Sequence, residues 1–520
     1  MAEGKSKNLI LAAMIFAVAM MFIDQTIVAI AIPELQEDLG LTSTGLQWVI
    51  NGYLLSLSAL FAFGGRIADI LGHRRMVIIG VIIFATASAL CGATPGDGGE
   101  AEAWIIVFRV IQGAGAAVMM PAALAIVIAS FPVSERGKAM AIFFAITGGL
   151  TSVGPIAGGY LTEIDWRAIF WVNIPIAIIA LTLITISKPE NEKRPAPIDY
   201  RGAVLVTAGM ALAVLGLQQA GTWGWGDART IGCVVAGLLI LAAFVAFERR
   251  VEHPLLNMRI FQSRAFFVDN VILFILMIPF VPLFFFGSTY SQISLGYDAS
   301  NAGLYLLTFF AGFAVASQFG GRILDSVGAR PAVVLGCAVT AVGLFLWGHS
   351  LTDLDFNDQW YFIVIAGAGV GLVLGPANTD AINRAPRASY GEVTGITQTV
   401  RNFGSSLGLA VLGSVLIVQN RSNLETTLGS EGIPTEKADE IAAAVAGAGG
   451  GDSSSLAEHA GSKAKEVFDA IQIDYAMSSR TVFYAMAGAM AVAFVIALIG
   501  MPGGKVEAPV SGEDAAPGPT

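Results

Sequence analysis

Residues 64–74 read Gly64-Gly65-Arg66-Ile67-Ala68-Asp69-Ile70-Leu71-Gly72-His73-Arg74, and they join the end of one long apolar run to the start of the next. The stretch recurs as Gly320-Gly321-Arg322-Ile323-Leu324-Asp325-Ser326-Val327-Gly328-Ala329-Arg330. The two glycines, the first Arg, the Ile, the Asp, the next Gly and the final Arg stay in register. Such a repeat in so apolar a chain predicts a duplicated membrane protein whose halves meet at equivalent loops.

The composition indicates a membrane protein. Of 520 residues, 55% are hydrophobic and 13% are charged, and the mean hydropathy is +0.71. Soluble domains carry about 25% charged residues. Stretches of about 20 apolar residues recur, each long enough to cross a hydrocarbon layer of about 30 Å as a helix. We therefore predict an all-α polytopic membrane protein. The net charge of −10 argues against a nucleic-acid partner, and the three cysteines and four histidines have no metal-ligand spacing.

Fourteen apolar segments are candidate membrane spans. They cover about residues 9–32, 46–70, 76–93, 103–130, 137–162, 168–187, 201–220, 230–248, 265–288, 299–322, 331–349, 360–385, 391–418 and 481–502. The repeated stretch follows the second and the tenth span, so two spans are inserted between equivalent halves. We expect an N-terminal six-helix bundle (1–187), a linker with two extra helices (188–264), a C-terminal six-helix bundle (265–502) and a disordered cytoplasmic tail (503–520).

Charged residues predict the orientation. Basic residues such as Arg74, Arg75 and Arg249 fall at alternate connections, whereas acidic residues such as Glu34 occupy the intervening ones. Because cytoplasmic loops carry an excess of Lys and Arg, both termini are expected in the cytoplasm. The run 9–32 is too long for a signal peptide and lacks a small-residue cleavage site, so we interpret it as an uncleaved first span.

Residues 419–480 form a polar segment outside the membrane, between the last two spans. Within it, Leu456, Val467, Ile471 and Tyr475 fall at helical spacing, which predicts an amphipathic helix. A cap over the external mouth and a solvated insertion are both compatible with this pattern.

Asp24 and Arg109 are the clearest functional candidates, because ionisable residues inside apolar runs are costly and are retained for function. Asp24 precedes Ile32 by eight residues and Arg109 follows Ala103 by six. At the helical rise they lie about 12 and 9 Å below the same outer surface, so an ion pair between them is expected. A carboxylate there can be neutralised by a proton or a cation, which suggests proton coupling. A fixed structural ion pair is the alternative.

The candidate substrate cavity consists of polar side chains within apolar spans of both halves. These are Asp24, Gln112, Asn378, Asp380, Gln398 and Arg401. The second-half members either contact substrate or line a water-filled cavity. Asp269 and Glu392, near the starts of their spans, are interpreted as interfacial residues.

The fifth span contains Gly154-Pro155-Ile156-Ala157-Gly158-Gly159. Gly154 and Gly158 lie on one helix face and permit close helix approach, while Pro155 frees a backbone carbonyl. The segment is either a close-packing site or a flexing point between the halves. The chain has no Walker A sequence, so ATP-driven pumping is not expected.

Together these residues resemble the major facilitator superfamily, and specifically its fourteen-span drug:proton antiporter branch. The matching motifs are Asp24-Gln25-Thr26-Ile27-Val28 with Pro33, the segment Gly65 to Arg75, Phe108-Arg109-Val110-Ile111-Gln112-Gly113-Ala114-Gly115, Gly154-Pro155-x-x-Gly158-Gly159, and Trp166-Arg167-Ala168-Ile169-Phe170 with Asn173 and Pro175. The resemblance covers nearly the whole chain except the outer insertion and the tail.

The resemblance implies two six-helix bundles around a central cavity, plus two extra helices. It also implies proton-driven export of hydrophobic, amphipathic or cationic compounds by alternating access, with Asp24 and Arg109 coupling to the proton. No cofactor is expected, and the protein is expected to be a monomer in the cell membrane. Alternatives are a dedicated exporter of a self-made antibiotic, lipid or siderophore, a non-transporting receptor, and a membrane-embedded enzyme. The last alternative lacks a recognisable nucleophile or metal cluster.

The resemblance further implies that the repeated stretch is a conformational gate. The gate residues are Gly65, Arg66, Asp69, Gly72, Arg74 and Arg75 in the first copy and Gly321, Asp325, Gly328 and Arg330 in the second. Asp69 is expected at a helix C-terminus, where its charge is unfavourable, so it needs a donor elsewhere. By resemblance this donor is the N-terminal end of helix eleven, near Gly328 to Pro331. The alternative is a basic turn that only fixes topology.

Overall fold

The computed structural model describes residues 2–190, 196–252, 254–385, 390–430 and 464–506, and these are almost entirely helical. The long helices are α1 (Ala2–Ile30), α3 (Ser43–Leu71), α4 (His73–Gly92), α5 (Gly98–Ser130), α6 (Arg136–Ile164), α8 (Asn173–Ser187), α9 (Tyr200–Gln218), α11 (Ala228–Glu248), α12 (Arg264–Ile293), α13 (Ala299–Val327), α14 (Ala329–Ser350), α15 (Trp360–Asn383), α16 (Tyr390–Ser430) and α19 (Ala464–Gly500). The short helices α2 (Ile32–Leu39), α7 (Ala168–Trp171) and α10 (Ala220–Trp223) lie in the connections between them.

The expected all-α membrane fold is confirmed. Thirteen helices among the described residues are long and apolar enough to cross a membrane. Helix α6, with 29 residues, coincides with the expected fifth span but is not one of these thirteen. The number fourteen therefore stays a prediction.

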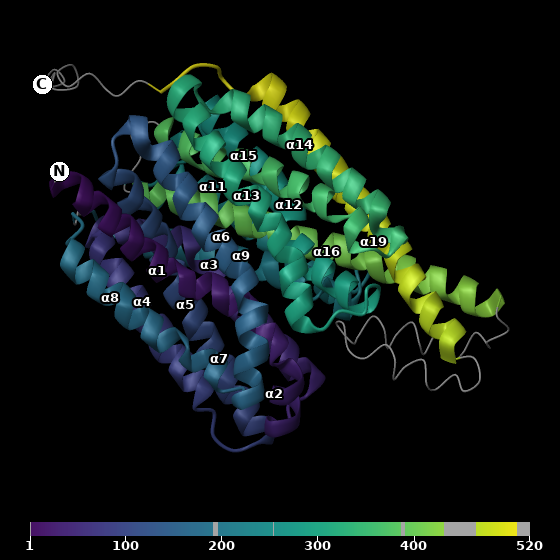
Figure 1. Cartoon of the computed structure of the whole chain (residues 1–520). Coiled ribbons are helices and arrows are strands. Elements are labelled where there is room, and N and C mark those ends of the chain that lie inside the picture. The colour runs from purple at the N-terminus through teal and green to yellow at the C-terminus, as the bar shows by residue number, and fades with distance from the viewer. Residues whose placement is uncertain (1, 191–195, 253, 386–389, 431–463, 507–520) are drawn as a thin grey trace, which may run out of the picture.

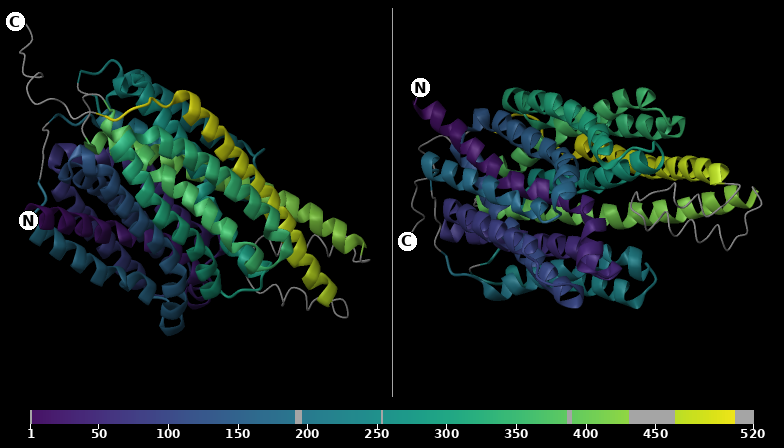
Figure 2. Two further views of the ribbon diagram at one scale, coloured as in Figure 1. Left: turned by 45° about the horizontal axis from the view of Figure 1, so that its top comes forward. Right: turned by 60° about the horizontal axis from the view of Figure 1, so that its bottom comes forward.

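The helices form two groups with matching internal contacts. In the first group α5 packs against α3 and α4, and in the second group α15 packs against α13 and α14. Figure 1 shows the first group in purple and blue on one side and the second in green and yellow on the other. The turned views of Figure 2 show the long helices of both groups running alongside one another. The repeated stretch thus marks equivalent positions, at the ends of α3 and α13.

Two crossings join the groups. Helix α3 of the first group packs against α16 of the second, and α13 of the second packs against α6 of the first. These crossings are related by the same equivalence, because α6 and α16 follow α5 and α15 in the chain. We call the end of the molecule that carries Gly72 and Gly328 the motif end.

Glycines allow the helices within each group to approach closely. A Cβ built on Gly113 of α5 would lie 2.4 Å from the backbone oxygen of Tyr53 in α3. In the other group, a Cβ on Gly367 of α15 would lie 2.0 Å from the backbone oxygen of Phe309 in α13. Close packing of this kind stabilises helix association in a membrane, because the hydrophobic effect does not drive helices together in lipid.

The inserted helices α9 and α11 pack against each other, and α9 also contacts α3 and α16. The insertion therefore adjoins one of the two crossings between the groups. It leaves the contact between α6 and α13 free of inserted chain.

The helices of the last two spans are longer than the expected spans at their outer ends. Residues 419–430 continue α16 and residues 464–480 belong to α19, so both helices extend beyond the expected spans 391–418 and 481–502. Leu424 and Ile471 are fully buried there, and Asn423 Nδ2 donates to Ser478 Oγ at 3.0 Å. The amphipathic spacing is thus confirmed for the described part of the segment, whose apolar face packs between the two helices. Leu456 and the tail beyond residue 506 lie outside the described residues.

Candidate functional site

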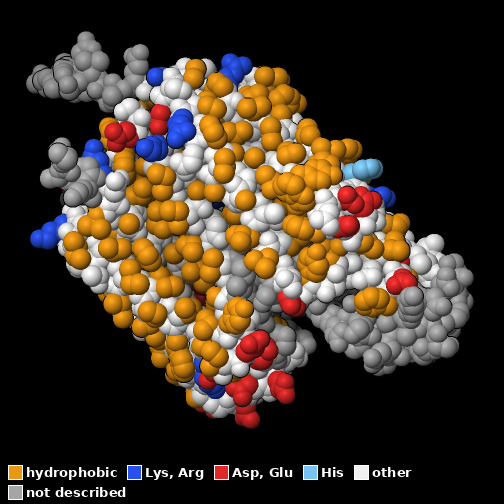
Figure 3. All heavy atoms as spheres, in the orientation of Figure 1, with side chains coloured by type: hydrophobic (Ala, Val, Ile, Leu, Met, Phe, Trp, Pro, Cys, Tyr) orange, Lys and Arg blue, Asp and Glu red, His pale blue; other side chains and the backbone are white. Residues whose placement is uncertain are grey.

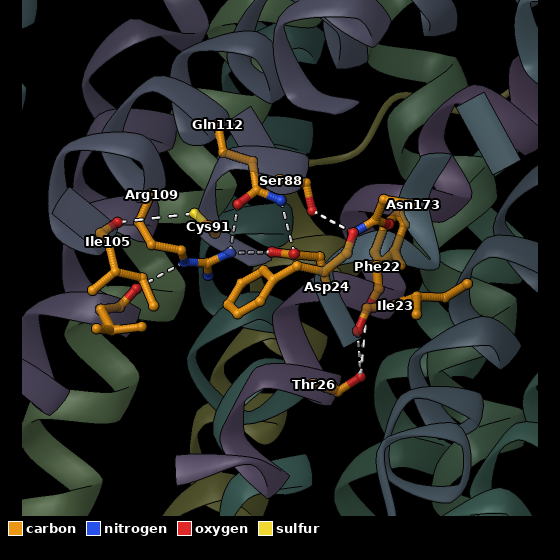
Figure 4. A network of polar contacts seen from close by, with 12 residues as sticks. Phe22, Ile23, Asp24, Thr26, Ser88, Cys91, Ile105, Arg109, Gln112 and Asn173 are labelled. Carbon is orange, nitrogen blue, oxygen red and sulfur yellow. Dashed lines mark hydrogen bonds and ion pairs between the residues drawn. The ribbon is translucent and has the colours of Figure 1, made fainter. Parts of the chain in front are cut away.

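Asp24 on α1 and Arg109 on α5 form the expected ion pair. Arg109 Nη1 donates to Asp24 Oδ2 at 2.6 Å and to Gln112 Oε1 at 2.8 Å, while Gln112 Nε2 donates to Asp24 Oδ1 at 2.8 Å. The three side chains therefore form a closed ring of hydrogen bonds, which Figure 4 shows with the three groups pointing at one another. Their exposed fractions are 0%, 1% and 0%, so the ring excludes solvent.

Arg109 is held by α3 as well. Its Nε donates to the backbone oxygen of Val49 at 2.8 Å, and its guanidinium carbon lies 4.4 Å from the centre of the Tyr53 ring. A buried guanidinium stays charged and has no acceptor, so it requires acceptors on several sides. One side chain thereby ties together α1, α3 and α5.

Gln112 closes the ring because its side-chain amide both accepts and donates a hydrogen bond. The oxygen faces Arg109, which has only donors, and the nitrogen faces Asp24, which has only acceptors when ionised. The spacing of three residues between Arg109 and Gln112 places both on one face of α5. Both hydrogen bonds of the Gln112 amide can therefore form in this orientation only while Asp24 is ionised.

Helix α6 packs against α1 beside this ring. A Cβ on Gly154 would lie 1.9 Å from Thr26 Oγ1 and 3.0 Å from the backbone oxygen of Ile23, so only glycine fits. Gly158 is buried and Gly159 is half-buried, whereas the side chain of Pro155 lies outside the described part of the structure. The glycine motif thus contacts the helix that carries Asp24, which is compatible with both sequence interpretations.

The expected gate residue Asp69 contacts the opposite half at the motif end. Its Oδ1 accepts from Gly391 N at 3.0 Å, and its Oδ2 accepts from Glu392 N at 2.7 Å. These are free amides in the first turn of α16, where a carboxylate is favourable. His73 Nε2 lies 2.9 Å from Asp69 Oδ1 as well.

The expected donor near Gly328 to Pro331 is wrong. The donor is the N-terminus of α16, which is the fifth long helix of the second half. Because α9 and α11 are inserted, the helix that would be eleventh in a chain of twelve lies further along this chain. Gly328 instead adjoins the tail, since a Cβ there would lie 2.3 Å from the backbone oxygen of Gly504.

The second copy makes the same contact in the other direction. Asp325 Oδ1 accepts from Gly137 N at 3.0 Å and its Oδ2 accepts from Lys138 N at 3.1 Å, in the first turn of α6. The glycine four residues earlier permits each approach. A Cβ on Gly65 would lie 2.2 Å from the Gly391 oxygen, and a Cβ on Gly321 would lie 2.5 Å from the Gly137 oxygen.

The next glycine of each copy makes the turn between helices. Gly72 has φ +100° and Gly328 has φ +106°, conformations that favour glycine. Arg330 Nη2 then donates to the backbone oxygen of Leu498 at 2.8 Å, which joins α14 to α19. Arg66 and Arg74 are half-buried and Arg75 is exposed.

Arg136 adds a further contact across the motif end. Its Nη1 donates to Asn383 Oδ1 at 2.7 Å, and its Nη2 donates to the Tyr390 hydroxyl at 2.9 Å. Arg136 lies in the sequence between the motif around Arg109 and the motif that begins at Gly154. A basic residue in such a connection indicates orientation but not that its side chain reaches the other half.

The polar residues of the second half separate into two groups. Arg401 Nη1 donates to Gln398 Oε1 at 2.5 Å, and its guanidinium carbon lies 5.4 Å from the Phe144 ring of α6. Asp380 Oδ2 instead accepts from Arg384 Nε at 2.8 Å, near the motif end. The structure therefore does not bring Asp380 together with Arg401.

Asp269 and Glu392, which the sequence places near the starts of their spans as interfacial residues, are both buried inside the protein. Asp269 is 0% exposed, and its helix α12 packs against α15, α16 and α19. Glu392 is also buried, and its Oε1 accepts from the backbone N–H of Asn257. The position of each residue near the start of its span does not show which helices cover it. Asn378 is likewise buried, on α15.

A cavity of about 230 Å³ lies between α3, α9, α12 and α16, away from the motif end. Its polar lining includes Gln25, Asn51, Ser58, Asn402 and Ser405, and its apolar lining includes Leu54, Val281 and Leu409. None of the six expected substrate-cavity residues lines it. Asn51 and Ser58 are seven residues apart, which places both on one face of an apolar helix, and this polar spacing could have indicated a cavity lining.

Within the described part of the chain, no group of three or more His, Cys, Asp or Glu residues is placed to hold a metal ion. Cys91 and Cys337 are buried and unbridged. The charged groups that the structure brings together at this site are Asp24 and Arg109.

Comparisons with known proteins agree on one family. The sequence profile of the Major Facilitator Superfamily matches residues 14–409. The chain is 33% identical over 413 residues to the tetracenomycin C resistance and export protein of Streptomyces glaucescens, which covers 78% of this chain and 75% of that protein. It is 30% identical over 424 residues to the multidrug transporter protein MdtP of Bacillus subtilis (strain 168), which covers 80% of this chain and 76% of that protein.

A solved structure shows the same fold. The proton:xylose symporter XylE bound to 6-bromo-6-deoxy-D-glucose aligns with a TM-score of 0.64, covering 97% of this chain and 98% of that one. The sequence identity is 12%, so this likeness concerns the fold alone.

Proposed function

The chain belongs to the major facilitator superfamily, and on that basis we propose that it is a proton-coupled antiporter that exports hydrophobic or amphipathic, cationic compounds. It is a membrane transporter and not an enzyme. The relatives named above carry export and multidrug transport in their names, which supports efflux as the direction. We expect the proton gradient to drive transport without a bound cofactor.

The ring of Asp24, Arg109 and Gln112 carries the proposal, because its hydrogen bonds depend on the charge of one carboxylate. If Asp24 is protonated on the oxygen that faces Arg109 or on the one that faces Gln112, its O–H points at an N–H group, which is also a donor. Turning the Gln112 amide to accept that proton would aim its N–H at Arg109, which has only donors. Protonation therefore breaks at least one charge-assisted bond, each worth about 1.5–3 kcal/mol.

We expect protonation of Asp24 to affect transport because it weakens the hydrogen-bonded ring. With Asp24 protonated, its attraction for Arg109 and for a cationic substrate falls, so the substrate is released on the side from which the proton came. Loss of the proton on the other side restores the charge and the site. One carboxylate thus serves the proton and the substrate in turn, as exchange requires.

We assign the motif end to the cytoplasm. In Figure 3 most of the visible Lys and Arg side chains lie toward the upper left, and a group of Asp and Glu side chains lies at the lower end. Exposed Arg75 and Arg250 lie at connections on the motif end, whereas exposed Glu37 and Asp97 lie at the other. This asymmetry supports cytoplasmic termini and residence in the cell membrane.

With that orientation, the contacts of Asp69 and Asp325 close the cytoplasmic side. The cavity lined by Asn51 and Asn402 then lies in the outer half of the molecule. We propose that this arrangement is the outward-facing state of an alternating-access cycle, and that the mixed polar and apolar lining suits amphipathic substrates. We expect the transporter to work as a monomer.

A dedicated exporter of one compound is the second candidate. The first of the two relatives is named for tetracenomycin C alone, whereas MdtP is named as a multidrug transporter. A panel of compounds separates the two, because a dedicated exporter transports one chemical class and a multidrug exporter transports several.

Inside-out membrane vesicles test the proposal. We expect compounds of the panel to accumulate inside the vesicles when the lumen is acidic, and accumulation to stop when an ionophore removes the pH gradient. Accumulation that is unchanged without the gradient would refute proton coupling. The same vesicles containing Asp97→Asn, a change at an exposed acid, should behave as the wild type does.

A further inference from the structure

A second buried carboxylate, Asp269 on α12, is left without a donor. Its side chain is 0% exposed, and neither of its oxygens accepts a hydrogen bond from any residue that the structure describes. The Asp269 carboxyl faces that of Asp380 on α15, a helix that packs against α12. Asp380 Oδ1 also lacks a donor, while its Oδ2 accepts from Arg384. Three of the four oxygens of this carboxyl pair are therefore unsatisfied.

The described charges around the pair do not compensate two carboxylates. Among the residues that the structure describes, Arg384 is the cation that faces both acids. Three other charged groups at this end of the molecule have partners: Arg264 Nη2 donates to the Ile499 oxygen at 3.1 Å, Arg330 donates to the Leu498 oxygen, and Glu392 accepts from the Asn257 amide. Among the described charges, two ionised acids beside one guanidinium leave a buried net negative charge.

One proton removes the excess charge and satisfies two of the three oxygens. When like-charged carboxyls share a buried site, one of them binds a proton far more readily than it does in water. The protonated acid then donates its O–H to the other, which supplies the missing donor. Arg384 compensates the charge that remains on the pair.

We propose that Asp269 and Asp380 hold one proton between them and form a second proton-binding site, in the C-terminal half. The site lies at the motif end: Asp269 is five residues into α12 and Asp380 is three residues from the end of α15, about 8 and 5 Å by helical rise. It is separate from the Asp24 ring, whose members all lie in the N-terminal half.

The pair is linked to the closure of that end. Arg384 Nη2 also donates to the Gly504 oxygen at 2.8 Å, and the adjacent Asn383 accepts from Arg136 of the other half. Opening the motif end breaks the second contact and admits water to Arg384, which is already 17% exposed. The pair holds its proton in the closed state and exchanges it with the cytoplasm on opening. This role in transport rests on the proposed function, whereas the shared proton does not.

Infrared difference spectroscopy on the purified full-length protein tests the shared proton without any transport. A protonated carboxylic acid has its own carbonyl band, which shifts in heavy water. We expect the wild type to lose this band as the pH is raised, with release of about one proton per chain assigned to the pair. Asp269→Asn should remove that band, because Asp380 is then the one acid left beside Arg384. Asp380→Asn should shift or remove it, because Asp269 stays buried but has lost the acid with which it shares the proton.

Two further variants make the result specific. Asp358→Asn, at an exposed acid, and Asp24→Asn, in the other half, should both keep the band. Asp269→Asn is expected to fold, because its amide N–H supplies the donor that Asp380 lacks. If both Asp269→Asn and Asp380→Asn retain the wild-type band, the second proton site is refuted. Failure of proton-driven efflux with the band present would instead refute the proposed function.

Discussion

Asp69 and Asp325 occupy equivalent positions in the two halves, and each accepts two backbone hydrogen bonds from the first turn of a helix in the opposite half. Asp69 binds α16 through the amides of Gly391 and Glu392, and Asp325 binds α6 through those of Gly137 and Lys138. The repeated sequence thus builds a symmetric pair of contacts that close one end of the molecule.

Asp69→Asn should weaken this closure. The amide keeps one acceptor but loses the charge, so at least one charge-assisted bond of about 1.5–3 kcal/mol is lost from the closed state. Since about 1.4 kcal/mol is a factor of ten, we expect the population open at the motif end to rise at least tenfold. Spin labels on cysteines at exposed Arg75 and Val327, in a background with native Cys233 replaced by Ser, report the distance between the halves.

Asp325→Asn is the matched variant for that measurement, because its contact is equivalent. We expect the same shift in the distance distribution. Unchanged distributions in both variants would show that these aspartates do not hold the gate.

Gly65→Ala should prevent the closed state by crowding. Its Cβ would lie 2.2 Å from the Gly391 oxygen, so α3 and α16 must separate. We expect a loss of efflux in vesicles with normal insertion in the membrane. Gly149→Ala is the control, because a Cβ there meets nothing within 4 Å and alanine favours a helix by about 1 kcal/mol. Wild-type efflux in Gly65→Ala would contradict the close crossing.

Arg109→Lys should impair transport although it keeps the charge. One ammonium cannot reach Asp24, Gln112 and the Val49 oxygen together, as the planar guanidinium does. Loss of one such bond to a charged group, about 1.5–3 kcal/mol, predicts at least a tenfold lower rate of gradient-driven efflux. Arg250→Lys, at an exposed arginine, should leave the rate unchanged. Equal rates in the two variants would argue that the ring only supports the structure.

The sequence was sufficient for the ion pair, because the depth of each residue along its helix is set by counting residues from the span ends. Asp24 and Arg109 matched in depth and are in contact. Periodicity does not say which helix ends meet across the halves, so the partner of Asp69 was misplaced by the two inserted helices. Counting also placed Asp269 near a membrane surface, whereas three neighbouring helices bury it.

The role of Gln112 could be found only in part. Its position three residues after Arg109 predicts a shared helix face, but its bridging of Asp24 depends on how α1 and α5 pack. The extension of α16 and α19 was hidden for a different reason. The sequence predicts a helix around Ile471, but its polar residues do not show that this helix continues the last span or that Ile471 and Leu424 are buried between α19 and α16.

The most direct test of the account is pH-gradient-driven efflux by Asp24→Asn, measured in inside-out vesicles beside Asp97→Asn at equal amounts of inserted protein. Asparagine can still accept from Arg109, so the helices stay together, but it cannot take up a proton. The account predicts that Asp24→Asn abolishes gradient-driven accumulation while Asp97→Asn retains it. Accumulation at the wild-type rate by Asp24→Asn would contradict the assignment of the proton to this carboxylate.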